Sequence, residues 1–211
     1  MNLVERRIVL ASGNAGKARE IGALLAPTGI EVVSQAAFGL ESADETGLTF
    51  IENALLKARH AAEGSGLPAI ADDSGLVVDA LDGAPGIHSA RYAGNGGDAA
   101  NIARLLAALE DVPESERTAR FVCVAVFLRS PEDPLPVVCQ GAWEGRIAAR
   151  PRGAGGFGYD PVFLPLGDAR SAAELAPEEK NRCSHRGRAF AALRLRLSGP
   201  GTPGEAGGDA P

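Results

Sequence analysis

The run Ala71-Asp72-Asp73-Ser74-Gly75, which stands between two apolar segments, limits the fold of this chain more than any other feature. Residues 67–71 and 76–81 both read as short buried strands, so the two aspartates are predicted at a break between strands. Strand ends and the loops after them are where α/β proteins place ligands. Adjacent carboxylates there are candidates to share one divalent cation, or to divide metal binding and water activation between them. The alternative is an Asx-type turn ahead of Gly75.

Length and composition describe an ordinary globular protein. Its 211 residues with 45% hydrophobic content are enough for one full core or two closely joined lobes. The longest uninterrupted apolar run, residues 121–128, is far below the roughly 20 residues that cross a bilayer, and no signal segment opens the chain. We therefore expect a cytoplasmic protein with no membrane partner. Residues 199–211 have almost no apolar content and are predicted to form a disordered C-terminal tail.

Charge and cysteine content narrow the possible partners. A formal net charge of -6 and a pI near 5.2 argue against a surface that binds polyanions, so we predict no nucleic-acid partner. Any phosphate site must then be local and must serve a small ligand. The three cysteines Cys123, Cys139 and Cys183 are widely spaced and show neither a CxxC pair nor a Cys/His metal spacing.

A glycine-rich loop near the start of the chain is a candidate anion site. A strand pattern over residues 7–11 leads into Ser12-Gly13-Asn14-Ala15-Gly16-Lys17, and a helical pattern follows. Glycines let the backbone approach a ligand closely, N–H groups are free at a helix start, and Lys17 adds a positive charge. The loop matches neither Walker A nor GxGxxG, because Ala11 and Ala18 replace required residues of the former. A plain strand-to-helix turn is the alternative.

A helix is predicted over residues 50–63. Thr49-x-x-Glu52 has the form of a capping box, and apolar residues keep helical spacing up to Gly64. Asn53 and Lys57 lie one turn apart off the apolar stripe, so they either face a cleft or are simple polar positions on a helix surface. The acidic residues 41–46 before this helix read as a solvated loop.

Further patterns predict a helix over residues 98–109 and a hairpin of two strands over 120–128 and 135–143.

Polar and aromatic residues of possible function gather again late in the chain. The run 153–161 then places Phe157, Gly158, Tyr159 and Asp160 among glycines. Lys180 lies in a short helix that starts after a proline, and Ser184 is placed to cap the last helix. That helix begins with His185 and Arg186, which read either as contacts to polar ring edges or phosphates, or as a solvated helix start.

Six blocks in this order carry a resemblance to a known family, and together they are specific although each is weak alone. The chain closely resembles the HAM1/RdgB family of inosine and xanthosine triphosphate pyrophosphatases from about Ile8 to Leu197. Ser12 stands where many members carry Thr, which keeps the hydroxyl. The blocks are Ser12-Gly13-Asn14-x-x-Lys17, residues 45–54, Ala71-Asp72-Asp73-Ser74-Gly75-Leu76, Gly83-Ala84-Pro85-Gly86, Gly156-Phe157-Gly158-Tyr159-Asp160-Pro161 and Ser184-His185-Arg186-Gly187.

The resemblance implies a fold and an activity. The fold is α/β, an elongated mixed sheet flanked by helices, with two lobes, a central nucleotide-binding cleft and a single domain over residues 1–198. The activity is Mg²⁺-dependent hydrolysis of ITP, dITP, XTP and dXTP to the nucleoside monophosphate and pyrophosphate. This cleanses the nucleotide pool and keeps deaminated purines out of DNA and RNA. A homodimer is implied as well.

The resemblance also implies roles for single residues. Glu45 and Asp73 would bind Mg²⁺, and Asp73 would accept the proton of the attacking water. Asn53 and Ser74 would contact the substrate. The residues that would hold the triphosphate are Ser12, Gly13, Asn14, Ala15, Gly16 and Lys17. Those that would hold the base and sugar are Phe157, Gly158, Tyr159, Asp160, Lys180, His185 and Arg186.

Cation placement explains why such residues suit the reaction. Water attack on a triphosphate needs positive charge over the oxygens, which Lys17, backbone N–H groups and Mg²⁺ would supply. An arginine near the 6-position of the base can donate to a keto oxygen but finds no acceptor on adenine, so Arg186 is expected to exclude ATP.

A Maf-like pyrophosphatase of other base preference and a non-catalytic nucleotide-binding module are the alternatives. The second would have no need of Asp73 and a metal.

Overall fold

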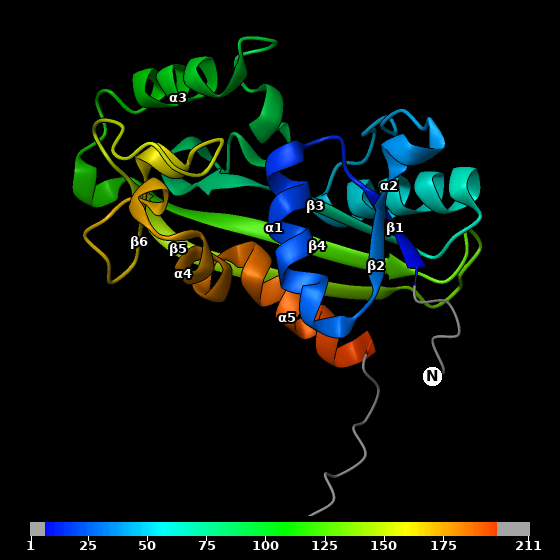
Figure 1. Ribbon diagram of the computed structural model, residues 1–211. Helices are drawn as coiled ribbons and strands as arrows, with labels where there is room; N and C mark the ends of the chain where they lie inside the picture. The colour runs from blue at the N-terminus through cyan, green and yellow to red at the C-terminus, as the bar shows by residue number, and fades with distance from the viewer. Residues whose placement is uncertain (1–6, 198–211) are drawn as a thin grey trace, which may run out of the picture.

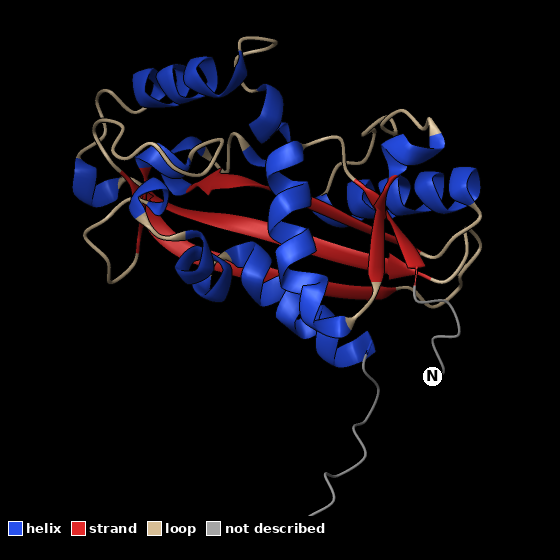
Figure 2. Cartoon of the chain, in the orientation of Figure 1, coloured by secondary structure: helices blue, strands red, loops and turns tan. Residues whose placement is uncertain are grey.

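A mixed sheet forms the centre of the protein (Figures 1 and 2), whose computed structural model describes residues 7–197. The strand order is β2-β1-β3-β4-β5-β6. The parallel part contains β1 (Arg7–Ala11), β2 (Glu31–Ser34) and the first residues of β3 (Ala69–Val78). The antiparallel part adds β4 (Thr118–Leu128), β5 (Val137–Ile147) and the short β6 (Phe163–Pro165). The predicted mixed sheet flanked by helices is confirmed, and β4 and β5 form the predicted hairpin.

Helices cover both faces of the sheet, as Figure 1 shows. On one face, apolar residues of α1 (Ala15–Leu25) and α5 (His185–Leu197) pack against Ile8, Leu10, Ile70 and Phe127. On the other face lies α2 (Phe50–Ser65), whose contact with the strands is made by four fully buried alanines, Ala54, Ala58, Ala61 and Ala62. Such small side chains let a helix approach a sheet closely. The predicted helical spacing is confirmed at Ala54, Ala58 and Ala62, whereas Asn53, which was predicted off the apolar stripe, is fully buried as well.

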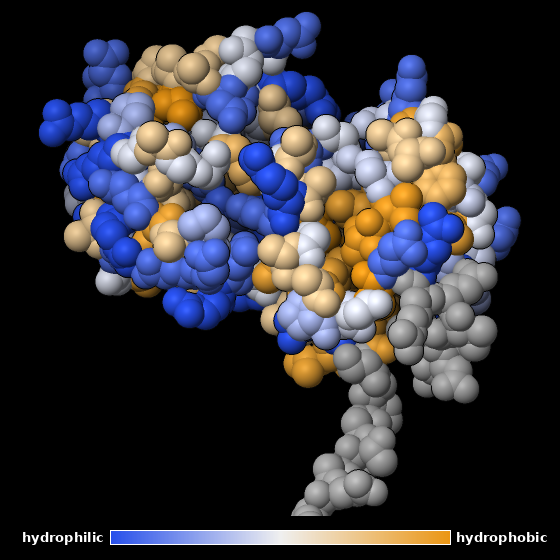
Figure 3. Space-filling view, viewed as in Figure 1, coloured by the Kyte–Doolittle hydropathy of each residue, from blue (hydrophilic) through white to orange (hydrophobic). Residues whose placement is uncertain are grey.

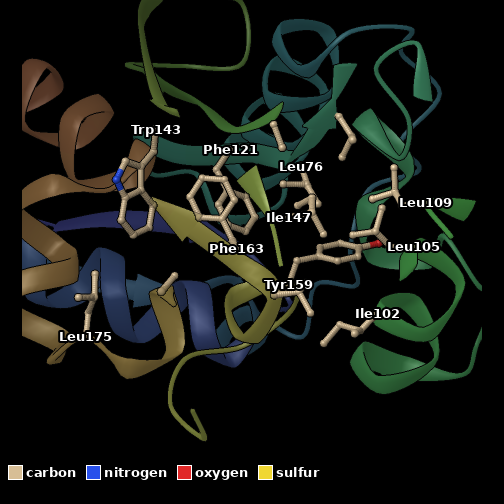
Figure 4. Close-up of a cluster of buried hydrophobic side chains, with 14 residues drawn as sticks. Leu76, Ile102, Leu105, Leu109, Phe121, Trp143, Ile147, Tyr159, Phe163 and Leu175 are labelled. Atoms are coloured by element: carbon tan, nitrogen blue, oxygen red, sulfur yellow. The ribbon is translucent and has the colours of Figure 1, made fainter. Parts of the chain in front are cut away.

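A third cluster of apolar side chains fills the other end of the molecule (Figure 4). There α3 (Gly97–Ala108) contributes Ile102 and Leu105, which pack with Leu76 of β3 and with the aromatic residues Phe121 and Phe163. Because β3 and β4 run through all three clusters, the two ends share one sheet. The short α4 (Pro177–Cys183) lies beside the start of α5. The residues Asp72 to Gly75 fall between the two ends.

The predicted break in the strand at Asp72 and Asp73 is wrong, because β3 continues without interruption from Ala69 to Val78. The antiparallel ladder with β4 holds it extended, pairing Asp72 with Ala125 and Asp73 with Val124. Successive side chains of a strand point to opposite faces. Asp72 accordingly contacts Arg186 of α5, whereas Asp73 contacts Lys57 of α2. Two aspartates placed in this way do not share one cation, so that reading of the pair is also wrong.

The end of β1 gives the two aspartates access to ligands. β1 pairs with β3 only as far as Ala11 and Ala71, and the chain then leaves the sheet into the glycine-rich loop. The edge of β3 beyond Ala71 is therefore free of β1 at the point where the aspartates begin. A strand end does create the opening, as the sequence suggested, but it is the end of β1 rather than a break in β3.

The predicted helix caps are present with one difference. Oγ1 of Thr49 accepts a hydrogen bond from the Glu52 N–H at 3.2 Å, while the Glu52 carboxylate accepts from the N–H of Leu48 rather than from that of Thr49. Oγ of Ser184 accepts from the Gly187 N–H at 3.1 Å and caps α5. The tail predicted over residues 199–211 lies outside the described residues.

The face of the molecule in Figure 3 is mostly polar, with a hydrophobic area over β1 and β2 beside α1. Ile30 and Val32 are partly buried apolar side chains of this region and pack against the core beneath α1 and α5. No helix in residues 7–197 combines the length and apolar content needed to cross a membrane.

Gly75→Ala is expected to destabilise the protein by about 1–3 kcal/mol, because a Cβ there would overlap neighbouring atoms. The added carbon would lie 2.5 Å from Oγ of Ser89 and still closer to the backbone oxygen of Gly86, which cannot rotate away. Thermal unfolding measures the effect. Gly22→Ala on α1 is the matched control, since no atom lies within 4 Å of its new carbon. An unchanged Tm for Gly75→Ala would show that the 86–89 segment is free to shift.

Candidate active site

Two adjoining cavities open between the two ends of the molecule. The first, of about 150 Å³, has aromatic walls from Phe121, Phe157 and Tyr159, and is also lined by Lys180, His185 and Arg186. The second, of about 270 Å³, is polar and is lined by Ser12, Gly13, Gln35, Ser42, Glu45, Lys57 and Asp72. Asn14, Lys17 and Ala90 line both. An aromatic compartment joined to a charged polar one matches a ligand with a ring at one end and phosphates at the other.

The glycine-rich loop forms the junction of the two cavities. Oδ1 of Asn14 accepts from the Lys17 N–H at 2.9 Å and caps α1. Ser12, Gly13, Asn14 and Lys17 line the cavities, whereas Ala15 and Gly16 do not. Gly16 has a different function, because a Cβ at this position would lie 2.7 Å from Cδ1 of Phe157. The missing side chain lets the aromatic ring lie directly against the loop.

Lys57 bridges the two carboxylates that the family resemblance implied as metal ligands. Its Nζ lies 3.0 Å from Oε1 of Glu45 and 2.6 Å from Oδ1 of Asp73. The second oxygen of Glu45 accepts from Nη1 of Arg91 at 2.9 Å. Burial raises the pKa of Asp73, and Lys57 offsets this only in part. Burial opposes the charge of Glu45 too, but there Lys57 and Arg91 outweigh it and lower the pKa.

The carboxylates at this position fit a hard divalent cation. Oδ2 of Asp73 is buried with no hydrogen-bond partner, so this oxygen is available as a metal ligand. Magnesium is commonly held by one or two carboxylates, with substrate phosphates and water completing its shell. Glu45 and Asp73 are the residues that could serve in this way. Residues 7–197 contain no group of three or more His, Cys, Asp or Glu side chains placed to hold a metal by themselves.

On the opposite face of β3, Asp72 is the centre of a buried ionic network. Its Oδ2 accepts from Nε and Nη2 of Arg186 at 3.3 and 3.2 Å and from the Ser74 hydroxyl at 2.9 Å, and Nζ of Lys17 lies 3.5 Å away. Burial opposes a charge on Asp72, but Lys17 and Arg186 outweigh it and hold the pKa well below its ordinary value. Arg186 also donates to Ser74 at 2.7 Å and to Glu20 at 2.5 Å.

The aromatic cavity is built around Phe157. Nζ of Lys180 lies 4.9 Å from the centre of its ring and Cζ of Arg186 lies 5.6 Å away, both within cation–π range. Oδ2 of Asp160 accepts from the Phe157 N–H at 2.8 Å and from Lys180 at 2.5 Å. These contacts hold the ring in place from the backbone side. The hydroxyl of Tyr159 is already used, since it donates to the carbonyl of Ser89 at 2.9 Å.

His185 contributes a neutral ring to the same wall. It stacks on Phe121 with ring centres 4.7 Å apart and planes inclined by 13°. Burial, with help from Arg186 and Lys180, moves its pKa well below the ordinary value, so the ring is uncharged at neutral pH. Nδ1 is buried without a partner among the described residues. A neutral imidazole offers one donor and one acceptor nitrogen, so His185 is suited to contact the edge of a polar ring.

The structure brings most of the predicted site residues together. Ala15, Gly16, Asn53 and Asp73 line neither cavity, but Asp73 is joined to the polar cavity through its ion pair with Lys57. Oδ1 of Asn53 accepts from the Gly47 N–H at 2.8 Å, which supports the loop that carries Glu45. The solvated reading of the start of α5 is wrong, because His185 and Arg186 are 4% and 2% exposed. The reading of residues 41–46 as an ordinary solvated loop fails at Glu45, which pairs with Lys57 and Arg91.

Sequence reasoning missed Glu20, the separate ionic network around Asp72, Asp98, and the pairing of Arg91 with Glu45. Glu20 bridges Lys180 and Arg186 at 2.8 and 2.5 Å, and Asp98 accepts from the Gly158 N–H at 2.6 Å. The spacing of Glu20 one turn after Lys17 was the available signal, because it places the carboxylate on the same side of the helix. No local pattern pointed to Asp98 or to the pairing of Arg91 with Glu45.

Comparisons with known proteins agree with this geometry. The model of the Ham1 family matches residues 8–195. A dITP/XTP pyrophosphatase of Thioalkalivibrio sulfidiphilus is 61% identical over 194 residues, 92% of this chain and 99% of that protein. A dITP/XTP pyrophosphatase of Shigella flexneri is 58% identical over 189 residues, 89% of this chain and 96% of that protein.

Solved structures give the same answer. A HAM1 protein from Coxiella burnetii superposes with a TM-score of 0.84 at 50% sequence identity, covering 91% of this chain and 98% of that one. This chain matches the family model and these proteins in sequence and in fold over nearly all of its described residues. It belongs to the Ham1 family.

Proposed function

We propose that this protein is a pyrophosphatase of noncanonical purine nucleoside triphosphates. It hydrolyses ITP, dITP, XTP and dXTP to the nucleoside monophosphate and pyrophosphate, which removes deaminated purines before polymerases can use them. The observation that carries this function is the joined pair of cavities, aromatic at Phe157 and charged at Lys17 and Lys57, in a chain 61% identical to a dITP/XTP pyrophosphatase. Membership of the Ham1 family sets the Maf-like alternative aside.

Each cavity has its own task in this proposal. The base enters the aromatic cavity, where Phe157 stacks on it and His185 contacts its edge. The triphosphate extends past Asn14 and Lys17 into the polar cavity, where Ser12 and Gly13 add hydroxyl and backbone contacts. The scissile bond then lies near Lys57 and Asp73, on the α2 side of β3.

Asp73 is proposed as the proton acceptor for the attacking water. Its raised pKa makes it a better base than an exposed aspartate, and before substrate binds its Oδ1 accepts from Nζ of Lys57 at 2.6 Å. Glu45 and Asp73 would hold Mg²⁺, which when bound supplies positive charge over the phosphate oxygens and makes water more acidic. Lys17 and Lys57 add charge at the same end of the site.

Further properties stay predictions. A homodimer is proposed, and the hydrophobic area over β1 and β2 (Figure 3) is the kind of surface that a second copy can cover. Sedimentation at several protein concentrations tests it. A cytoplasmic location, the absence of a nucleic-acid partner, and a single domain that ends at residue 198 also stay predictions.

The function is tested by pyrophosphate release from ITP, XTP, GTP, ATP and CTP, each with and without Mg²⁺. We expect kcat/KM for ITP and XTP to exceed that for ATP by at least about 10²-fold, because a base site with unpaired polar groups rejects the wrong ring strongly. Removal of Mg²⁺ is expected to abolish turnover. Binding of ITP without release of pyrophosphate from any of the five nucleotides would favour the non-catalytic module.

A further inference from the structure

Lysine is the rare basic residue of this chain, and all three copies lie at the site. Lys17, Lys57 and Lys180 stand beside 18 arginines in the sequence. Each lines at least one of the two cavities, and their side chains are only 17%, 12% and 6% exposed. An ammonium is a compact point charge, whereas a guanidinium is broad and planar. All other basic side chains, histidine aside, are arginines, so lysine occurs only at the site, where a compact cation fits.

Lys57 shows what this compactness is for. Its ammonium lies in the gap between Glu45 and Asp73, 3.0 and 2.6 Å from one oxygen of each. A divalent cation that bound both carboxylates would have to approach the same two oxygens or their immediate neighbours. The ammonium and the metal therefore compete for the attraction of the same pair of negative charges.

The charges around the polar cavity are balanced without any metal. The ion pairs there and beside the adjoining aromatic cavity involve five carboxylates and five cations, namely Glu20, Glu45, Asp72, Asp73 and Asp160 with Lys17, Lys57, Arg91, Lys180 and Arg186. A divalent cation alone would leave two uncompensated positive charges in a partly buried place, which is unfavourable. A triphosphate brings more negative charge than the cation brings positive charge. Metal and triphosphate together can therefore be accommodated where the metal alone cannot.

We propose that Lys57 is a stand-in cation for the metal. In the free enzyme its ammonium satisfies Glu45 and Asp73 and keeps a divalent ion out. When the triphosphate arrives with its metal, Lys57 moves from the carboxylates to a phosphate oxygen and releases them. The inference rests on the proposed function, because it takes Glu45 and Asp73 as the metal ligands. Its consequence is that metal and nucleotide strengthen each other's binding.

The test measures Mn²⁺ binding by electron paramagnetic resonance, with the full chain and without turnover. Wild-type protein is expected to bind Mn²⁺ weakly, and an ITP analogue with a methylene in place of the α,β-bridging oxygen is expected to tighten binding at least about tenfold. Lys57→Met has an uncharged side chain of similar length. It is expected to bind Mn²⁺ at least about tenfold more tightly than wild type without any nucleotide, since the competing charge is gone.

Arg91→Gln is the matched control. It also removes a cation from Glu45, at 2.9 Å, but from Oε2, whereas Lys57 contacts Oε1 and is the residue that also contacts Asp73. Arg91 is exposed, so its removal is expected to change Mn²⁺ affinity by less than about fivefold. A comparable gain in both variants would mean that any nearby positive charge matters and that the position of Lys57 is not special.

Thermal unfolding gives a second readout that does not depend on Mn²⁺ spectra. Lys57→Met leaves Asp73 without its ion-pair partner and Glu45 with Arg91 alone, so the variant should unfold at a lower temperature than wild type. Mg²⁺ alone should then raise the Tm of this variant but leave that of wild type unchanged, because a ligand stabilises the form that binds it. Lys57→Gln serves in the same way if Lys57→Met does not fold.

Two further results would overturn the inference, and they differ in whether the proposed metal site survives. Equal and tight Mn²⁺ binding by wild type and Lys57→Met without nucleotide would show that Lys57 does not block the gap, while the metal site itself remains. No Mn²⁺ binding by any form, even with the analogue, would remove Glu45 and Asp73 as ligands. In that case the proposed metal site and the stand-in role of Lys57 fail together.

Discussion

Asp73→Asn is expected to fold normally and to bind nucleotide, yet to lose at least about 10²-fold in kcat, the usual loss for a positioned base. The amide cannot accept the proton of water, and it replaces the negative charge opposite Lys57, which lies 2.6 Å from Oδ1. The fold should tolerate the change because the two side chains have nearly the same shape. Single-turnover hydrolysis of ITP and calorimetric binding of the methylene analogue separate the chemical step from binding.

Asp79→Asn is the control for this experiment. Asp79 follows the end of β3 and pairs on the surface with Arg120 at 2.7 Å, far along the strand from the cavities. Its substitution should leave kcat unchanged within experimental error. Asp73→Asn with a kcat within about threefold of wild type would remove Asp73 from the catalytic step, since a lost base costs far more.

Local sequence patterns predicted the elements of this fold because their causes are local. Helical spacing of apolar residues placed α2 and α3 close to their observed bounds, and the caps at Thr49 and Ser184 were readable from residues next to them. The continuity of β3 was not readable in this way. It depends on a ladder with β4, whose residues lie about 50 positions further along the chain, as in the pairing of Asp73 with Val124.

The site was only partly predictable for the same physical reason. Motifs identified which residues carry charge, but a charged side chain acquires its function from its partner, and the partners are distant in sequence. Arg186 meets Asp72 across 114 positions and Glu20 across 166. The sequence therefore pointed to Asp72 and Asp73 as a pair, whereas the sheet separates them. Asp72 is the centre of the ionic network with Arg186 and Lys17, whereas Asp73 pairs with Lys57 on the other face.

Arg186→Ala is expected to lower the free energy of unfolding by about 3–5 kcal/mol, which is typical when one partner of a buried ion pair is removed. Arg186 is 2% exposed, and its loss would leave Asp72 and Glu20 as poorly compensated charges in the interior. For a chain of this size such a loss corresponds to a decrease in Tm of roughly 10 °C. Chemical and thermal unfolding measure it, and Arg188→Ala, on the exposed side of α5, is the control.

This burial limits how much base selectivity Arg186 can supply. Its four hydrogen bonds to Asp72, Ser74 and Glu20 leave one of the five guanidinium N–H groups for a ligand. One charged hydrogen bond to a 6-keto oxygen contributes about 10- to 100-fold to the preference for ITP over ATP. A site whose polar groups all pair only with the correct base reaches ~10⁴-fold.

Arg186→Lys keeps the charge in the network and should fold, so it is the variant for measuring selectivity. We expect the ratio of kcat/KM for ITP to that for ATP to fall by about 10- to 100-fold, the worth of one charged hydrogen bond. An unchanged ratio would assign the keto group to another residue, of which His185 with its unpartnered Nδ1 is the first candidate. A fall beyond about 10³-fold would mean that Arg186 leaves Asp72 when the base enters, because only a released guanidinium has enough donors for such an effect.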